Sequence, residues 1–114
     1  MLAPMPRGIL ATCTARLVSP RTGTAELRGA LAAAYAAEPF VTVLPDGRWP
    51  GTGAVAGSNG AHVQAAADHR SGRATVVAAI DNLGKGAAGQ AIQNANLMLG
   101  LPESAGLTSI GVSP

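Results

Sequence analysis

Aromatic side chains are nearly missing from this sequence of 114 residues, which has one Phe, one Trp and one Tyr. Hydrophobic residues still make up 47% of the chain, and alanine is the most frequent of them. Burial stabilises by about 25 cal/mol per Å² of apolar surface, so small side chains contribute little each. The composition therefore predicts a folded domain with a marginal core, which relies on contacts beyond its own.

The sequence also contains only one cysteine, Cys13, and no long apolar segment. A single cysteine excludes an internal disulfide and fits a reducing, cytoplasmic compartment. The first residues lack the apolar stretch of a secretory signal. The longest uncharged stretches contain Gly, Pro, Asn and Gln, so no membrane-spanning helix is expected.

Charged residues are few, at 12% of the chain, and the formal net charge is +2. The arginines are scattered and do not alternate with aromatic residues, so a nucleic-acid interface is not expected. His62 and His69 lack a metal-ligand spacing, and the acidic residues are scattered. Cys13 lies in the middle of a predicted strand with no suitably spaced His, which favours a buried structural cysteine. The residues by themselves therefore indicate no catalytic set and no metal site.

Strand and helix patterns alternate along the chain. Period-two alternation or short apolar runs predict strands at residues 8–18, 40–44, 62–67 and 74–80. The last of these is nearly unbroken, which predicts cover on both faces. Helices are expected from Thr24, a possible cap, to Glu38 before Pro39, and at residues 87–99. The order predicts an α+β fold: a mixed, largely antiparallel sheet with its helices on one face.

The last predicted helix carries no charge, because residues 86–102 contain no Asp, Glu, Lys or Arg. Its expected core stripe consists of Ala88, Ala91, Ile92, Ala95 and Leu99. The opposite side presents neutral amides and a leucine, namely Gln90, Gln93, Asn94 and Leu97. Surface helices normally present Lys and Glu there, so this helix is expected to pack against a further domain or partner.

Two features near residue 84 suggest ligand contacts. Gly84-Lys85-Gly86-Ala87-Ala88-Gly89 matches the dinucleotide pattern G-x-G-x-x-G, but no second strand with a terminal acid follows, so the first glycine is interpreted as coincidental. Gly86 and Gly89 still permit close backbone approach to a ligand. Asn82 follows a predicted buried strand, and its amide can donate and accept, as binding to a carboxamide requires. The alternative is that Asn82 only closes the loop through an Asx-turn.

Short runs along nearly the whole chain carry a family resemblance. They are Pro4–Thr12, Tyr35–Val41, Leu44–Gly47, Thr52–Asn59, Ala79–Leu83, Lys85–Ala91, Gln93–Asn94, Asn96–Met98 and Gly100–Glu103. In this order they resemble N-acetyl-gamma-glutamyl-phosphate reductase, an enzyme of arginine biosynthesis. Gly51 and Gly84 depart from the family, which usually has Arg and a branched apolar residue there.

The resemblance implies a fold like the C-terminal domain of glyceraldehyde-3-phosphate-dehydrogenase-like enzymes. Residues 1–114 would form a partial C-terminal domain for catalysis and dimerisation, without the N-terminal Rossmann domain. The implied reaction is the reversible NADP-dependent conversion of N-acetyl-glutamyl 5-phosphate to N-acetyl-glutamate 5-semialdehyde. The family's catalytic Cys and His lie upstream, and Cys13, His62 and His69 do not match them. This chain alone is therefore expected to be inactive and to belong to a homo-oligomer, a dimer or tetramer.

The resemblance also assigns candidate binding residues. Asn82 falls where related dehydrogenases place an Asn against the nicotinamide carboxamide, and Gly86 is the second predicted cofactor contact. Arg7 suits an anionic acyl phosphate or carboxylate, although a solvated Arg at a strand edge is an equal alternative. Ser58 and Asn59 are predicted to serve the substrate or to position their loop.

Three other hypotheses remain open from the sequence. The fold could serve as a non-catalytic module that only makes subunit contacts. The chain could also be part of an aspartate-semialdehyde-dehydrogenase-like enzyme, which shares the Asp-Asn-Leu and Lys-Gly-Ala-Ala-Gly segments. A small nucleotide binder that uses the glycine loop is the third possibility.

Overall fold

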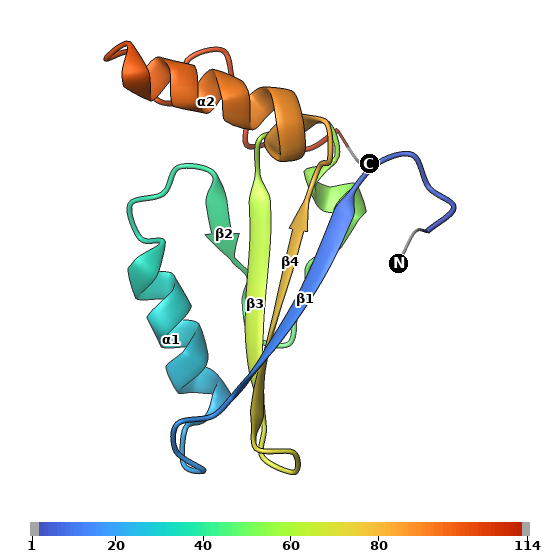
Figure 1. Ribbon diagram of the computed structural model, residues 1–114, viewed down its shortest axis with the longest axis vertical. Coiled ribbons are helices and arrows are strands. Elements are labelled where there is room, and N and C mark those ends of the chain that lie inside the picture. The colour runs from blue at the N-terminus through green and yellow to red at the C-terminus, as the bar shows by residue number, and fades with distance from the viewer. Residues whose placement is uncertain (1–2, 113–114) are drawn as a thin grey trace.

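The computed structural model describes residues 3–112 (Figure 1). Its strands are β1 (Ile9–Arg16), β2 (Val41–Val43), β3 (Ala61–Asp68) and β4 (Arg73–Ile80). Its helices are α1 (Thr24–Ala34) and α2 (Gly89–Met98), with a 3₁₀ turn η1 (Thr52–Val55) and a π-helical turn η2 (Gly84–Ala88). The predicted elements are all present, and the first helix ends four residues before the predicted end at Glu38.

The strands of the described residues form one sheet in the order β1-β4-β3-β2. β4 pairs antiparallel with both β1 and β3, whereas β2 pairs parallel with β3. The predicted α+β class and the mixed, largely antiparallel sheet are therefore confirmed. The polar turn after Asp68 joins β3 to β4 as a hairpin, as its Ser and Gly residues predict.

The two helices occupy different positions. α1 runs beside β3 and β2, whereas α2 lies across the end of the sheet (Figure 1). Only α1 therefore takes the predicted place on a sheet face. Thr24 was a candidate cap, but it is the first helical residue, and its Oγ1 accepts a hydrogen bond from the N–H of Ala67 at 3.0 Å. This bond attaches the start of α1 to β3.

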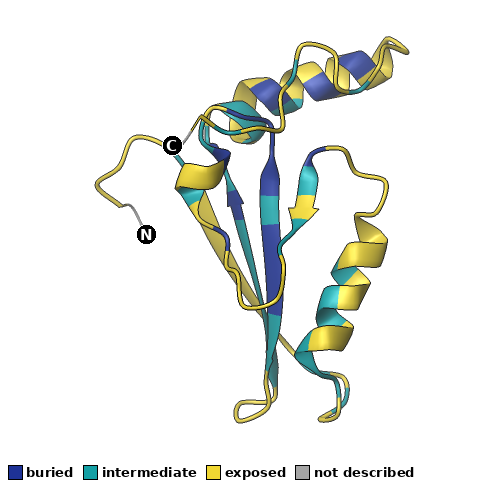
Figure 2. Cartoon of the chain, turned by 180° about the vertical axis from the view of Figure 1, so that it is seen from behind, coloured by how far each residue is buried: buried dark blue, intermediate teal, exposed yellow. Residues whose placement is uncertain are grey.

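The core is small and made largely of short side chains. Its buried hydrophobic residues within the described range are Phe40, Val55, Ala61, Val63, Ala65 and Ala79. β1 is exposed along its whole length, and β4 is mostly half-buried (Figure 2). The prediction that the 74–80 strand is covered on both faces is therefore wrong for this chain. The prediction of a buried Cys13 is also wrong, because Cys13 lies on an edge strand that no layer covers.

α2 is oriented opposite to the prediction. Its buried residues are Gly89, Gln93 and Asn96. The residues expected to face the core are all exposed: Ala88, Ala91, Ile92, Ala95 and Leu99. The reason is that the inner side of α2 packs against polar backbone groups of the segment that follows the helix. Asn96 Nδ2 donates to the carbonyl oxygens of Glu103 at 3.1 Å and Ala105 at 2.9 Å.

The apolar side of α2 yields a prediction about association. Met98 is 86% exposed and Leu99 is 72% exposed, and Ile92 and Leu97 are also exposed. Exposed apolar patches of this kind promote association. We expect Met98→Glu/Leu99→Glu to reduce self-association of this chain at micromolar concentrations, as measured by analytical ultracentrifugation, without lowering its melting temperature.

The matched control for this experiment is Gln93→Glu on the buried side of the same helix. Gln93 Nε2 donates to the Glu103 carboxylate, whereas a carboxylate at position 93 could not donate and would be repelled by Glu103, which its contact with Lys85 Nζ offsets only in part. This control should lower the melting temperature and leave association unchanged. Equal association of the parent chain and the double variant would locate the associating surface elsewhere.

Candidate functional site

Three segments that are far apart in the sequence meet at one end of the sheet. They are the segment before β1, the loop that follows η1, and the loop between β4 and η2. Figure 1 shows all of them on the side of the sheet where α2 lies. This is also the end at which β4 leaves the sheet, at Ile80.

The carboxylate of Asp81 joins these segments. The side chain has no exposed surface. Its Oδ2 accepts hydrogen bonds from Arg7 Nη2 at 2.5 Å and from the Gly57 N–H at 2.6 Å. Its Oδ1 accepts from the N–H groups of Leu83 and Gly84, each at 2.8 Å. A buried carboxylate is tolerated only when it is paired and hydrogen-bonded, and these donors meet that requirement.

These donors also set the charge state of Asp81. Burial by itself raises the pKa of this carboxyl group, because a charged group is less stable away from water. The hydrogen bonds from Gly57, Gly84, Arg7 and Leu83 favour the ionised form and outweigh burial. The pKa of Asp81 therefore lies well below its ordinary value of 3.8, and the group is ionised at neutral pH.

The Arg7 side chain contacts the buried Asp81 and is also partly exposed to solvent. Its ion pair with Asp81 uses one of the five N–H groups that a guanidinium carries. The side chain is 43% exposed, whereas that of Asp81 is fully buried. Arg7 is therefore an arginine that is anchored by Asp81 and partly exposed, and it differs from the freely solvated arginine of the alternative interpretation.

Asn82 holds the segment before β1 in place. Its Oδ1 accepts a hydrogen bond from the Gly8 N–H at 2.7 Å, and its Nδ2 approaches the Pro6 carbonyl oxygen at 3.4 Å. The Asx-turn expected of this loop is made by Asp81, whose Oδ1 binds the N–H groups of residues 83 and 84. An amide oxygen can accept two hydrogen bonds and an NH₂ group can donate two, so Asn82 retains capacity for a ligand.

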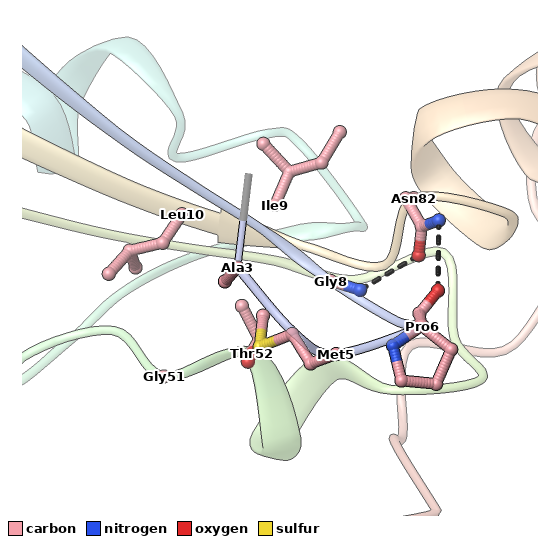
Figure 3. Close-up of a pocket in the computed structure, with 9 residues that line it drawn as sticks. All are labelled: Ala3, Met5, Pro6, Gly8, Ile9, Leu10, Gly51, Thr52 and Asn82. Carbon is pink, nitrogen blue, oxygen red and sulfur yellow. Dashed lines mark hydrogen bonds between the residues drawn. The ribbon is translucent and has the colours of Figure 1, made fainter. Parts of the chain in front are cut away.

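A hollow of about 750 Å³ lies beside Asn82 (Figure 3). Its other lining residues are mostly apolar or small: Ala3, Met5, Pro6, Gly8, Ile9, Leu10, Gly51 and Thr52. Gly8 has φ +104°, and a Cβ there would overlap the side chain of Thr52, so this position requires glycine. The hollow thus combines an apolar wall with one amide, as small-molecule sites commonly do.

Ser58 and Asn59 do not reach this hollow. Each is 2% exposed. Ser58 Oγ donates to the Val55 carbonyl oxygen at 2.9 Å and accepts from the Gly60 N–H at 3.0 Å. Asn59 Nδ2 donates to Gln93 Oε1 at 2.8 Å. These contacts fit the loop-positioning half of the prediction for this segment.

The glycine motif packs against the same loop. A Cβ at Gly84 would overlap the Ser58 carbonyl oxygen, and one at Gly89 would overlap Asn59 Oδ1. These two glycines therefore serve close approach within the chain. Gly86 is the exposed member of the motif, and its N–H donates to the Asp81 carbonyl oxygen at 2.8 Å.

A second polar cluster, which the sequence did not suggest, connects η2 with α2. Lys85 Nζ donates to Gln93 Oε1 at 2.6 Å and lies 5.6 Å from the centre of the Phe40 ring. Burial lowers the pKa of Lys85, and the charges of Glu103 and Glu38 oppose that shift. This cluster explains why amides occupy the inner side of α2.

Neither Cys13 nor the histidines belong to the site. Cys13 lies within β1, His62 lies on β3 and His69 lies in the hairpin turn at the far end. No group of three His, Cys, Asp or Glu side chains among residues 3–112 is placed to hold a metal ion. Within the same range, none of the helices is both long enough and apolar enough to cross a bilayer.

Comparison with known proteins defines the family. Residues 1–82 match the family described as semialdehyde dehydrogenase, dimerisation domain, and the chain therefore belongs to that family. Over 114 residues it is 63% identical to the N-acetyl-gamma-glutamyl-phosphate reductase of Frankia casuarinae and 61% identical to that of Acidothermus cellulolyticus. It is 60% identical to the same enzyme of Salinispora tropica over 117 residues. Each comparison covers 100% of this chain and 33% of the relative, so the chain spans a third of their length.

Proposed function

We propose that this chain acts as part of an N-acetyl-gamma-glutamyl-phosphate reductase in the cytoplasm. The observation that carries the proposal is the 63% identity to the Frankia reductase across all 114 residues. The reaction would reduce N-acetyl-glutamyl 5-phosphate to N-acetyl-glutamate 5-semialdehyde and release phosphate. An upstream Rossmann domain would supply the catalytic Cys and His, since none of Cys13, His62 and His69 lines the hollow.

The hollow fits the nicotinamide end of NADP. Its volume of about 750 Å³ lies within the range of ligand sites, and its walls are mainly apolar. Asn82 would orient the nicotinamide carboxamide, and Gly86 would let the loop backbone approach the cofactor. NADPH supplies the hydride when bound. The apolar wall would exclude water from the reacting face, which strengthens the polar contacts made there.

Arg7 would bind the anionic end of the substrate. Its guanidinium is anchored by Asp81, and its side chain is 43% exposed. Charge-assisted hydrogen bonds from Arg to phosphate or carboxylate are stronger than neutral ones. Ser58 and Asn59 would position the loop whose Gly57 N–H binds the same Asp81 oxygen.

The rest of the enzyme would cover the surfaces that this chain leaves open. The exposed side of α2 and the uncovered β1 strand are the candidate contacts for the Rossmann domain and for a second subunit. The family description names a dimerisation domain, which supports a homo-oligomer. A module for subunit contacts alone remains the competing function, and it requires neither Arg7 nor Asn82.

The test is a chimera in which this chain replaces the matching third of the Frankia reductase. We expect the purified chimera to oxidise N-acetyl-glutamate semialdehyde with NADP and phosphate, and the chain alone to show no turnover. A parallel assay with aspartate semialdehyde distinguishes the related dehydrogenase. A folded, oligomeric chimera without activity toward either aldehyde would contradict the proposal and favour the contact module.

A further inference from the structure

Asp81 has no role in the proposed chemistry, yet it contacts the groups that surround the hollow. It binds Arg7, whose chain neighbours Pro6 and Gly8 line the hollow, and it directly precedes Asn82, which also lines it. Its carboxylate is fully buried, so it cannot meet a ligand directly. Any influence on binding must therefore act through the residues that it holds.

We propose that Asp81 is a positioning residue that fixes the orientation of the Arg7 guanidinium for an anionic substrate group. This inference rests on the proposed function. The other donors to Asp81 are backbone N–H groups, which hold the carboxylate rigidly in the loop between β4 and η2. Arg7 is the one side chain among these donors, and it is 43% exposed.

The physical reason is preorganisation. An exposed arginine loses rotamer freedom when it binds an anion, and this loss of entropy opposes binding. A guanidinium that is already anchored through Nη2 has lost much of that freedom in the free protein. Its planar fork then presents the remaining N–H groups in one orientation, which a lysine ammonium cannot reproduce.

The experiment is a double-mutant cycle in the active chimera. KM and kcat are measured for N-acetyl-glutamate semialdehyde and, separately, for inorganic phosphate. We expect Asp81→Asn to raise one of these KM values about tenfold while kcat changes little. Arg7→Ala should raise the same KM at least as much. The double variant should be no worse in KM than Arg7→Ala, because Asp81 acts through Arg7.

The KM that rises identifies the anion: the phosphate value indicates a phosphate site, and the semialdehyde value indicates the substrate carboxylate. The control is Gln64→Leu, which removes another buried polar side chain. Gln64 is 2% exposed and bonds to carbonyl oxygens of Leu44, Pro45 and Arg48, and none of these residues lines the hollow. It should lower the melting temperature with both KM values unchanged.

Three results would overturn the inference in an active chimera: unchanged KM values for Asp81→Asn, multiplicative effects in the double variant, or a fall in kcat alone. If Asp81→Asn does not fold, Arg7→Lys carries the test. Lysine can keep the ion pair but loses the fork, so its KM should approach that of Arg7→Ala. A parental KM for Arg7→Lys would reject the positioning role. An inactive parent chimera would instead count against the proposed function.

Discussion

Replacing Asp81 with alanine should leave this chain largely unfolded at neutral pH. The substitution strands the Arg7 guanidinium and three backbone N–H groups that converge on one buried carboxylate. A buried donor left without its acceptor costs about 1–3 kcal/mol, and three backbone N–H groups lose theirs here. That loss is comparable with the whole stability of many domains, about 5–15 kcal/mol, and this core is built from small side chains.

Circular dichroism with urea titration measures this effect. The control is Asp46→Ala, because Asp46 is an exposed carboxylate in a turn and should change the unfolding free energy little. Equal stability of the two variants would show that the junction at Asp81 does not hold these segments together.

The low pKa of Asp81 predicts how the free energy of unfolding depends on pH. The folded pKa of Asp81 lies below its unfolded value of 3.8, so its stabilising contribution is complete above that pH. As the pH falls below about 4, the unfolded state takes up a proton first, and the contribution declines by about 1.4 kcal/mol per pH unit. The stability difference between the parent chain and Asp81→Asn, which keeps an acceptor oxygen but does not titrate, should therefore shrink between pH 5 and pH 3. A difference that stays constant would contradict the charge state assigned to Asp81.

The second large effect is expected at Asn82. In the chimera, Asn82→Ala should lower kcat about 10–100-fold, because a misplaced nicotinamide ring loses its reactive geometry. The substitution also frees the Gly8 N–H, which should cost about 1–3 kcal/mol of stability if it stays unsatisfied. Activity must therefore be expressed per folded molecule.

Asn82→Asp separates the two roles. A carboxylate can still accept from the Gly8 N–H, so the segment before β1 should stay in place, but it cannot donate to the oxygen of a carboxamide. We expect Asn82→Asp to fold like the parent chain and to lose kcat nearly as much as Asn82→Ala. Full activity in Asn82→Asp would mean that Asn82 only holds the segment.

Sequence patterns predicted where the strands and helices lie better than they predicted which residues are buried. Alternation and turn residues located all the strands because these signals are local. Burial failed where it depended on layers that this chain does not contain. Cys13 alternates with polar residues as a half-buried strand should, yet β1 is exposed on both faces. The apolar stripe of α2 was likewise expected inside, but Gln93 and Asn96 occupy the buried side.

The candidate site was predicted in part. Asn82 and Arg7 were proposed individually, and the structure brings both to Asp81, 74 residues from Arg7 in the chain. No local pattern indicates such a long-range pairing. The available signal was an acidic residue directly after an apolar strand, a position where burial requires donors from elsewhere. Ser58 and Asn59, the predicted substrate or loop-positioning residues, are buried, and their side chains bond within the chain.

The most direct test of the account is the turnover of the chimera after Cys13→Ser substitution. The account holds that this chain supplies binding and positioning groups and that the catalytic thiolate lies in the other domain. Cys13 is exposed midway along the edge strand β1, where it pairs with Val76 of β4. The Cys13→Ser chimera should oxidise N-acetyl-glutamate semialdehyde with the kcat of the unsubstituted chimera. A folded Cys13→Ser chimera without turnover, beside an active parent, would contradict the account.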